Sequence, residues 1–397
     1  MKTVFLEPLW KLRGEYQYLI QYPPEGYRFV AQDTWTEREA QLLSRFDASY
    51  RILFALYKLV PVQLVKPFLE RFRQPPKGTD LTYAILHPVF RRESWVLDMC
   101  GEQAQLLVGS EGMFRRFRSV LGRALASSLC KGIICHVDVG KRAFLNALGI
   151  PELERKIHVI YPAVPARSFH KEYRRDGPLR ILFVSSANID SVWQFRDKGG
   201  LVLLEAYKAL RKRFGKLELI IRSRVPAEVC AEYRAEHGIR FVQDVLPWGE
   251  FEALFQSADI FVCPAHLTPS MTFLDAMSYE LPIVTTDVWS SPEIVEDGRT
   301  GLLVHHPEAH RYIVDSVAHY DWPAFRQERV RVHPDLVAGI VERVSVLVEN
   351  PDLRREMGRA GRREVEQGKF SIARRNKELK RLLDEAIQSA LTAPQGG

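Results

Sequence analysis

Apolar positions along the first half of the chain alternate between short runs and helical spacing. The runs are typical of strands, which we expect at Thr3–Phe5, Tyr27–Val30, Tyr83–Leu86, Trp95–Met99, Gly132–His136 and Lys156–Tyr161. The spacing predicts helices at Glu37–Leu59, Gln103–Leu129 and Val139–Leu148. Strands separated by helices indicate an α/β fold with a doubly wound parallel sheet.

A polar stretch, His170–Pro178, leads into a second series of the same kind. Its strands are expected at Leu179–Ser185, Leu217–Ile221, Arg240–Gln243, Ile260–Cys263 and Pro282–Thr285, and its helices at Gly200–Phe214, Glu228–His237, Trp248–Ala258, Asp335–Leu347 and Pro351–Glu366. We therefore expect one domain over residues 1–175 and a second over 176–370, which suits a chain of 397 residues. A helix at 371–390 and a disordered tail at 391–397 follow.

Composition agrees with a globular protein, because 46% of the residues are hydrophobic and 11% aromatic. No apolar run reaches the roughly 20 residues that span a bilayer. Residues 1–12 predict a strand broken by Pro8 rather than a signal segment. The five cysteines form no CxxC pair, so we expect reduced thiols, no zinc site and a cytoplasmic location.

The net charge of +7 is unevenly distributed. Residues 1–175 carry 27 Lys and Arg against 17 Asp and Glu, whereas the remainder carries 29 against 32. Basic residues alternate with aromatic ones around Arg51–Arg73 and Arg115–Arg123. This pattern suits an anionic membrane surface, here the inner face of a membrane, or an anionic acceptor. A solvated helix face explains it equally well.

Residues 305–334 contain five histidines, of which four lie within 15 positions: His305, His306, His310 and His319. Their spacing fits no established metal-binding template. We interpret the segment as a surface insertion and predict no metal site.

The common nucleotide motifs are missing from the sequence. It contains no G-x-G-x-x-G after a first strand, no P-loop and no D-x-D. A diphosphate ligand would therefore be neutralised by backbone amides and basic side chains. The run Phe261–Val304 supplies such amides, because it predicts a strand, a loop, a helix carrying Asp275, a second strand and a Gly298/Gly301 hairpin. Phosphorylated ligands bind at this edge of open parallel sheets.

This run resembles the donor-binding motif of retaining glycosyltransferases of family 4, which have the GT-B fold. The resemblance covers about Leu179–Phe370, with a looser match over Gly132–Phe169. It implies two Rossmann-like domains facing each other across a cleft, with helix 371–390 crossing back to the first. It also implies a nucleotide-sugar donor, retention of anomeric configuration, and neither a metal nor another cofactor.

The resemblance assigns donor-binding roles to residues of the second domain. Lys198, just before a helix, corresponds to the lysine that holds the diphosphate. Ser185 and Ser186 stand where the family has an arginine, so Arg196 and Arg222 are the candidates to supply that charge. Val245 and Leu246 would border the nucleobase, or pack in the core. Asp275 would bind the two ribose hydroxyls, although helix-dipole stabilisation is the simpler alternative.

The sugar end of the motif departs from the family. Leu267 replaces a glutamate that contacts the donor sugar, and Thr268-Pro269-Ser270 replaces a flexible glycine-containing turn. Ser270, Met271 and Thr272 would still offer amides to the diphosphate or sugar. His266 is a candidate substitute for the lost polar contact; the alternative is a structural histidine.

Candidates on the acceptor side lie in the first domain. Gly14 and Glu15 stand in for the family's glycine-rich first loop. Asp98 and Glu102 lie where the family places a histidine, and His87 ends the preceding strand. Of these, Glu102 and His87, together with Lys198, are the predicted catalytic residues.

The sequence thus predicts a glycosyltransferase whose partners are a nucleotide sugar and a glycan or lipid-linked acceptor. The alternative is a catalytically silent relative that binds a nucleotide sugar as an assembly subunit, which the loss of the glutamate at Leu267 favours. No recognition motif for nucleic acid is present.

Overall fold

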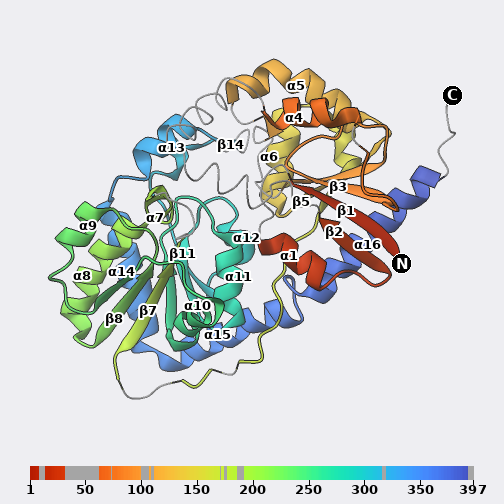
Figure 1. Cartoon of the computed structure of the whole chain (residues 1–397). Coiled ribbons are helices and arrows are strands. Elements are labelled where there is room, and N and C mark those ends of the chain that lie inside the picture. Colours follow the sequence, from red (N-terminus) through yellow and green to blue (C-terminus); the bar gives the residue numbers. More distant parts are fainter. Residues whose placement is uncertain are drawn as a thin grey trace. The chain divides into compact units, whose positions relative to one another are not determined.

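The computed structural model describes residues 1–8, 14–31, 62–72, 74–99, 107–108, 111–169, 171–173, 177–185, 192–314 and 319–391. The chain divides into two compact units (Figure 1). Unit 1 comprises Met1–Pro162, Ser316–His319 and Ala373–Gly397, and unit 2 comprises Ala163–Asp315 and Tyr320–Ile372. Each contains a six-stranded sheet.

The sheet of unit 1 has the order β2-β1-β3-β4-β5-β6, and its strands pair in parallel. The strands are β1 (Lys2–Pro8), β2 (Tyr27–Ala31), β3 (Leu81–Ile85), β4 (Trp95–Met99), β5 (Cys130–Cys135) and β6 (Ile157–Val159). The helices are α1 (Gly14–Gln21), α4 (Val62–Leu69), η1 (Glu70–Phe72), α5 (Glu111–Ala126), α6 (Asp138–Leu148) and η3 (Pro151–Lys156). The predicted helix at Glu37–Leu59 lies outside the described residues.

Helix α16 (Ile372–Leu391) packs on the sheet of unit 1 from Ala373 onward. Leu379, Leu382 and Leu383 join a core cluster with residues of β1, β2 and β3. Gly132 on β5 makes room for this helix, because a Cβ atom there would lie 2.6 Å from Leu382 Cδ1. Asp384 on the same helix also links it to the sheet, since it accepts hydrogen bonds from Lys2 and Tyr27, and a third from Lys380. These hydrogen bonds hold the pKa of Asp384 far below its usual range.

The sheet of unit 2 has the order β12-β11-β10-β7-β8-β9, again parallel. Its strands are β7 (Leu179–Val184), β8 (Leu217–Arg222), β9 (Ile239–Val242), β10 (Ile260–Cys263), β11 (Ile283–Thr286) and β12 (Gly301–Val304). The helices are α7 (Trp193–Asp197), α8 (Gly200–Phe214), α9 (Ala227–Glu232), α10 (Trp248–Ser257), α11 (Ser270–Ser278), α12 (Ser291–Ile294), α14 (Pro334–Glu349) and α15 (Pro351–Glu366). Two parallel-sheet α/β domains were predicted, and the structure confirms them.

Two local predictions in unit 2 are wrong. Helix α9 ends at Glu232 instead of His237, because the chain turns at Tyr233, whose buried hydroxyl bonds to Glu205 on α8. Residues 305–334 are not a simple surface insertion either. They contain η4 (Ala309–Arg311), β13 (Ile313–Val314), β14 (His319–Tyr320) and α13 (Trp322–Glu328), and they bury His306 and Phe325.

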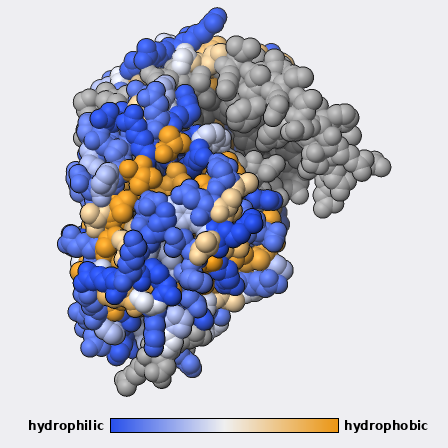
Figure 2. Space-filling model, turned by 90° about the vertical axis from the view of Figure 1, so that its left-hand side faces the viewer, coloured by the Kyte–Doolittle hydropathy of each residue, from blue (hydrophilic) through white to orange (hydrophobic). Residues whose placement is uncertain are grey.

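No helix in the described ranges is long and apolar enough to cross a membrane. On the face shown in Figure 2, hydrophobic residues form patches within a largely hydrophilic surface. Cys130, Cys135, Cys230 and Cys263 are free thiols. Among the residues that the structure describes, no group of three His, Cys, Asp or Glu is placed to hold a metal ion.

Candidate functional site

The strand order of unit 2 changes direction between β7 and β10, which are neighbours in the sheet. The chain continues from β7 to β8 and β9 on one side, and from β10 to β11 and β12 on the other. The chain therefore leaves β7 and β10 toward opposite edges of the sheet, and open α/β sheets bind their ligands at this switch point. The predicted donor residues Lys198 and His266 lie on the loops that follow these two strands.

Close backbone contact joins the two loops. Gly199 has φ +75°, and a Cβ atom there would lie 1.9 Å from the carbonyl oxygen of Pro264. The His266 amide donates to Asp197 O at 3.0 Å, and Lys198 Nζ donates to Leu267 O at 2.7 Å. Helix α8 starts at Gly200, so its N-terminal amides and a buried lysine meet at the switch point.

The two candidate arginines differ in their surroundings. Arg222 ends β8, is buried, and donates from Nη1 to Ser185 O at 3.1 Å, which places its guanidinium beside the end of β7. Burial lowers its pKa. Arg196 on α7 instead pairs with Glu228 at 3.2 Å. Arg222 therefore lies beside the strand end where the family's arginine is missing, whereas Arg196 pairs with an acidic residue. The donor-binding roles of both arginines stay predictions, and Ser186 lies outside the described residues.

Helix α11 brings its N-terminus to the loop after β10. The amides of Thr272 and Phe273 both donate to Pro269 O, so those of Ser270 and Met271 precede the first helical hydrogen bond. Such amides are suited to an anionic ligand. The amide of Thr272, by contrast, already serves the helix itself.

His266 lies in a buried histidine pair. Its Nδ1 is 2.8 Å from Nε2 of His306, and both rings are about 1% exposed. Burial and the neighbouring His306 hold the pKa of His266 well below its usual value. The sequence had suggested a sugar contact or a structural histidine at this position, and the pairing with His306 corresponds to the structural role.

Asp275 lies one turn into α11 and keeps 20% of its side chain exposed. Burial raises its pKa to about 6, while Arg167 at 3.5 Å acts in the opposite direction. Arg167 also approaches Glu252 and lies over the rings of Trp248 and Tyr279. No sequence pattern pointed to Arg167, because it lies in an irregular segment far from Asp275 along the chain. Val245, 59% exposed, and Leu246 follow β9.

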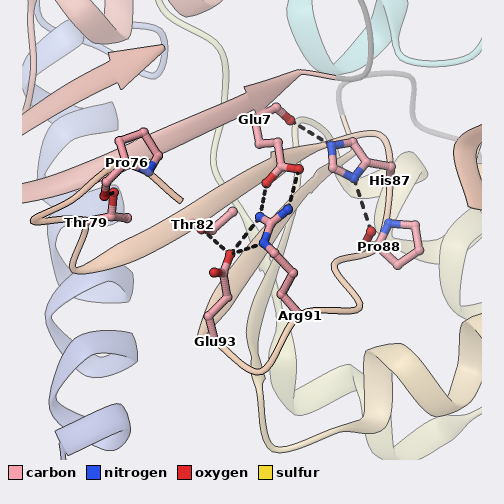
Figure 3. A network of polar contacts seen from close by, with 8 residues as sticks. All are labelled: Glu7, Pro76, Thr79, Thr82, His87, Pro88, Arg91 and Glu93. Carbon is pink, nitrogen blue, oxygen red and sulfur yellow. Dashed lines mark hydrogen bonds and ion pairs between the residues drawn. The ribbon is translucent and has the colours of Figure 1, made fainter. Parts of the chain in front are cut away.

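Unit 1 has its own switch point, between β1 and β3. Figure 3 shows the buried ion pair there: Arg91 Nη1 donates to Glu7 Oε1 at 3.0 Å, and Nη2 donates to Glu7 Oε2. Arg91 also bonds to Glu93, which accepts from Thr82. His87 Nε2 lies 2.8 Å from Glu7 O and its Nδ1 lies 3.1 Å from Pro88 O, so backbone carbonyls engage both of its nitrogens.

The remaining acceptor-side candidates come from other parts of residues 1–175. Gly14 and Glu15 begin α1, and no described atom lies within 4 Å of a Cβ atom placed on Gly14. Its neighbours in the fold therefore do not require a glycine. Asp98 is buried near the end of β4. Glu102 lies outside the described residues. The catalytic and binding roles of all these residues stay predictions.

Part of the chain is similar to known proteins. The model of the family described as Glycosyl transferases group 1 matches residues 179–318. The alpha-maltose-1-phosphate synthase of Mycobacterium tuberculosis is 31% identical over 224 residues, which are 54% of this chain and 50% of that protein. The D-inositol 3-phosphate glycosyltransferase of Paenarthrobacter aurescens is 29% identical over 170 residues, which cover 38% of this chain and 40% of that protein. The chain spans about half the length, or less, of the curated relatives it matches.

Solved structures share the fold over nearly the whole chain. The sucrose-phosphate synthase of Thermosynechococcus elongatus superposes with a TM-score of 0.61 at 14% identity, covering 98% of this chain and 99% of that one. Anabaena Alr3699/HepE, in complex with UDP and glucose, superposes with a TM-score of 0.60 at 14% identity, covering 97% of this chain and 99% of that one. Residues 179–318 are therefore similar to the glycosyl transferases group 1, and the two units have the GT-B fold.

Proposed function

We propose that the protein is a glycosyltransferase that moves a sugar from a nucleotide-sugar donor to a hydroxyl group of a glycan, glycolipid or small molecule. The observation that carries this proposal is the switch point of unit 2. There, Lys198, Arg222 and the N-termini of α8 and α11 surround one edge of the sheet, with Asp275 one helical turn away. Cations and helix N-termini bind a diphosphate, and a carboxylate binds the two hydroxyls of a ribose.

The chemistry follows from the charge that develops on the leaving group. The bond between the anomeric carbon and the diphosphate breaks, and its electron pair goes to the phosphate oxygen. Lys198 and the helix amides stabilise that charge. The acceptor oxygen then bonds to the same face of the carbon, and its proton goes to the leaving phosphate oxygen. Retention and independence from metals and cofactors follow the family resemblance.

A catalytically silent relative is the second candidate, and Leu267 is the observation that favours it. Its backbone carbonyl accepts the hydrogen bond of Lys198, and its side chain offers no oxygen to a sugar. A silent relative would still bind the nucleotide through Asp275, so nucleotide binding and sugar transfer must be measured separately.

Unit 1 has a surface suited to a lipid-linked acceptor on the inner face of a membrane, with the protein in the cytoplasm. The rings of Phe68 and Phe72 on α4 and η1 are exposed, and Arg71 lies 3.9 Å and 4.3 Å from their centroids. Aromatic rings beside a cation suit an interface with anionic lipids. Sedimentation with phosphatidylglycerol vesicles tests this point, and equal recovery of the protein with neutral vesicles would contradict it.

Calorimetry with UDP-glucose, UDP-N-acetylglucosamine and GDP-mannose tests the donor site. We expect binding to at least one, lost in Asp275→Ala and kept in Asp335→Ala, which removes an exposed carboxylate from the first turn of α14. Affinity should also fall below about pH 6, because Asp275 then becomes protonated.

Product analysis with octyl glucoside, glucose 1-phosphate and glycerol as acceptors then tests sugar transfer. No binding to any donor would refute the proposal, and binding without transfer or donor hydrolysis would favour the silent relative.

A further inference from the structure

Residues 163–169 begin unit 2 as an irregular segment, and helix α15 holds this segment by its backbone. Arg362 on α15 donates from Nη2 to Arg167 O at 2.8 Å, and from Nη1 to Phe169 O. The same Nη1 donates to Glu280 Oε1 at 3.0 Å. Two carbonyls and a carboxylate therefore hold the planar guanidinium of Arg362 in one orientation.

Glu280, in the turn that follows α11, has a strained backbone. Its φ is +56°, in the left-handed region that favours glycine, although its side chain is buried. Helix α15 approaches this turn closely, because a Cβ atom on Gly358 would lie 2.2 Å from Glu280 O. Arg362 lies one helical turn after Gly358 and so faces the same place. Such strain persists only where the surroundings hold it, and here Arg362 and the Tyr173 hydroxyl, at 2.8 Å, bind the Glu280 carboxylate.

The side chain of Arg167 extends from the held segment to Asp275, the carboxylate proposed to bind the ribose. Its Nη2 lies 3.5 Å from Asp275 Oδ1, and its Nη1 lies 3.9 Å from Glu252 Oε1. At 3.5 Å the contact with Asp275 is at the long limit for a hydrogen bond, so it acts mainly through charge. Asp275 Oδ2 accepts no hydrogen bond within the part of the chain that the structure describes, which leaves it for a ligand hydroxyl.

The ionisation of Asp275 depends on where Arg167 is held. Burial raises the pKa of Asp275 to about 6, the charge of Arg167 lowers it, and that of Glu252 on α10 raises it. An ionised carboxylate accepts hydrogen bonds from both hydroxyls of a ribose, whereas a protonated one uses an oxygen as a donor. A displaced Arg167 would therefore weaken ribose binding near the pKa of Asp275 and leave it unchanged at higher pH.

We propose that Arg362 and Glu280 are positioning residues of the donor site, which hold the guanidinium of Arg167 beside the Asp275 carboxylate. Arg167 acts through Asp275, and the ligand group concerned is the ribose of the nucleotide sugar. This inference rests on the proposed function. It extends the donor site to a strained turn and to helix α15, whose residues lie far from the family's donor motif along the chain.

Calorimetry at pH 6 and pH 8, with the donor that binds in the screen above, tests the role of Arg167. In Arg167→Gln the cation is lost, so Asp275 should become protonated about one pH unit higher. Nucleotide affinity should then fall about fivefold at pH 6 and hardly change at pH 8. A general structural defect would instead weaken binding equally at both. Arg167→Lys keeps the charge and should restore most of the affinity at pH 6.

Two variants test the positioning residues. Arg362→Lys keeps a charge but cannot donate to two carbonyls and a carboxylate from one plane. Glu280→Gly removes the carboxylate while glycine relieves the backbone strain, so the turn stays folded. We expect both to lose affinity about twofold or more at pH 6 and little at pH 8. Arg363→Lys, an exposed neighbour on α15, should bind as the wild type at both.

Unchanged affinity at pH 6 in Arg167→Gln, or equal losses at pH 6 and pH 8, would overturn the inference and leave the donor site standing. A loss at pH 6 in Arg167→Gln without one in Arg362→Lys and Glu280→Gly would overturn the positioning role. No binding of the wild-type protein to any donor at either pH would refute the donor site itself, and this inference with it.

Discussion

The buried pair His266 and His306 should make the protein lose stability as the pH falls. The amide of Glu308 donates to Nδ1 of His306, so Nε2 of His306 carries the proton and donates to Nδ1 of His266. Both imidazoles are therefore neutral in the folded protein. Burial, together with the nearby His333, lowers the pKa of His306 from 6.5 to about 4.

The size of the effect follows from this shift. Below pH 6.5 the unfolded chain binds a proton at His306, whereas the folded protein binds that proton only near pH 4. The free energy of unfolding therefore decreases as the pH falls from about 6.5 to about 4. At about 1.4 kcal/mol per pH unit, lowering the pH from 7 to 5 costs about 2 kcal/mol through His306 alone.

Urea unfolding at pH 7 and pH 5 measures this cost, with His306→Gln as the test variant. Glutamine does not titrate, so the variant should lose about 2 kcal/mol less than the wild-type protein between the two pH values. His310→Gln is the control, because it removes an exposed histidine from the same segment and should lose as much as the wild type. If all three proteins lose the same amount, the reasoning is wrong.

Two further predictions concern the switch points. Gly199→Ala should lower the melting temperature more than Gly215→Ala and weaken nucleotide binding. Both glycines flank α8 at positive φ, where an alanine costs about 1–2 kcal/mol of stability. Only at Gly199 would the added Cβ atom also clash with a carbonyl oxygen. Equal decreases in melting temperature for the two variants would contradict this prediction. Arg91→Met should cost about 3–5 kcal/mol in urea unfolding, because it leaves Glu7 buried without its ion pair. Arg92→Met, an exposed neighbour, should cost little, and a similar cost for both would show that the ion pair is unimportant.

The sequence predicted the strands well because parallel strands covered on both faces are continuous apolar runs. Trp95–Met99 and Ile260–Cys263 have the predicted bounds, and all of their residues are buried. Boundaries set by side-chain contacts were less predictable. Helix α9 ends where Tyr233 turns inward to Glu205, and neither residue marks a helix end by its type.

The sequence predicted candidate site residues only where they lie within one continuous stretch of the chain. Lys198 and Asp275 could be named because the first lies just before a helix and the second lies on one, each in a recognisable run of sequence. The contact of Arg167 with Asp275 joins residues 108 positions apart, and the hydrogen bond from Arg362 to the carbonyl oxygen of Arg167 joins residues 195 positions apart. His306 was misjudged because its segment is polar, although its ring is buried against His266.

The two departures from the family motif in unit 2 have a common structural consequence. Where an arginine is missing after β7, Arg222 of the adjacent strand donates to the carbonyl of Ser185. Where a glutamate is missing at Leu267, Lys198 donates to the backbone carbonyl of that residue. A carbonyl orients a cation without cancelling its charge, whereas a glutamate beside Lys198 would form an ion pair. These substitutions therefore keep positive charge at the edge where we propose that a diphosphate binds, while they remove a carboxylate that would contact the sugar. If the proposed donor site is right, its nucleotide end is preserved, and any specificity for the sugar comes from groups other than the family's glutamate.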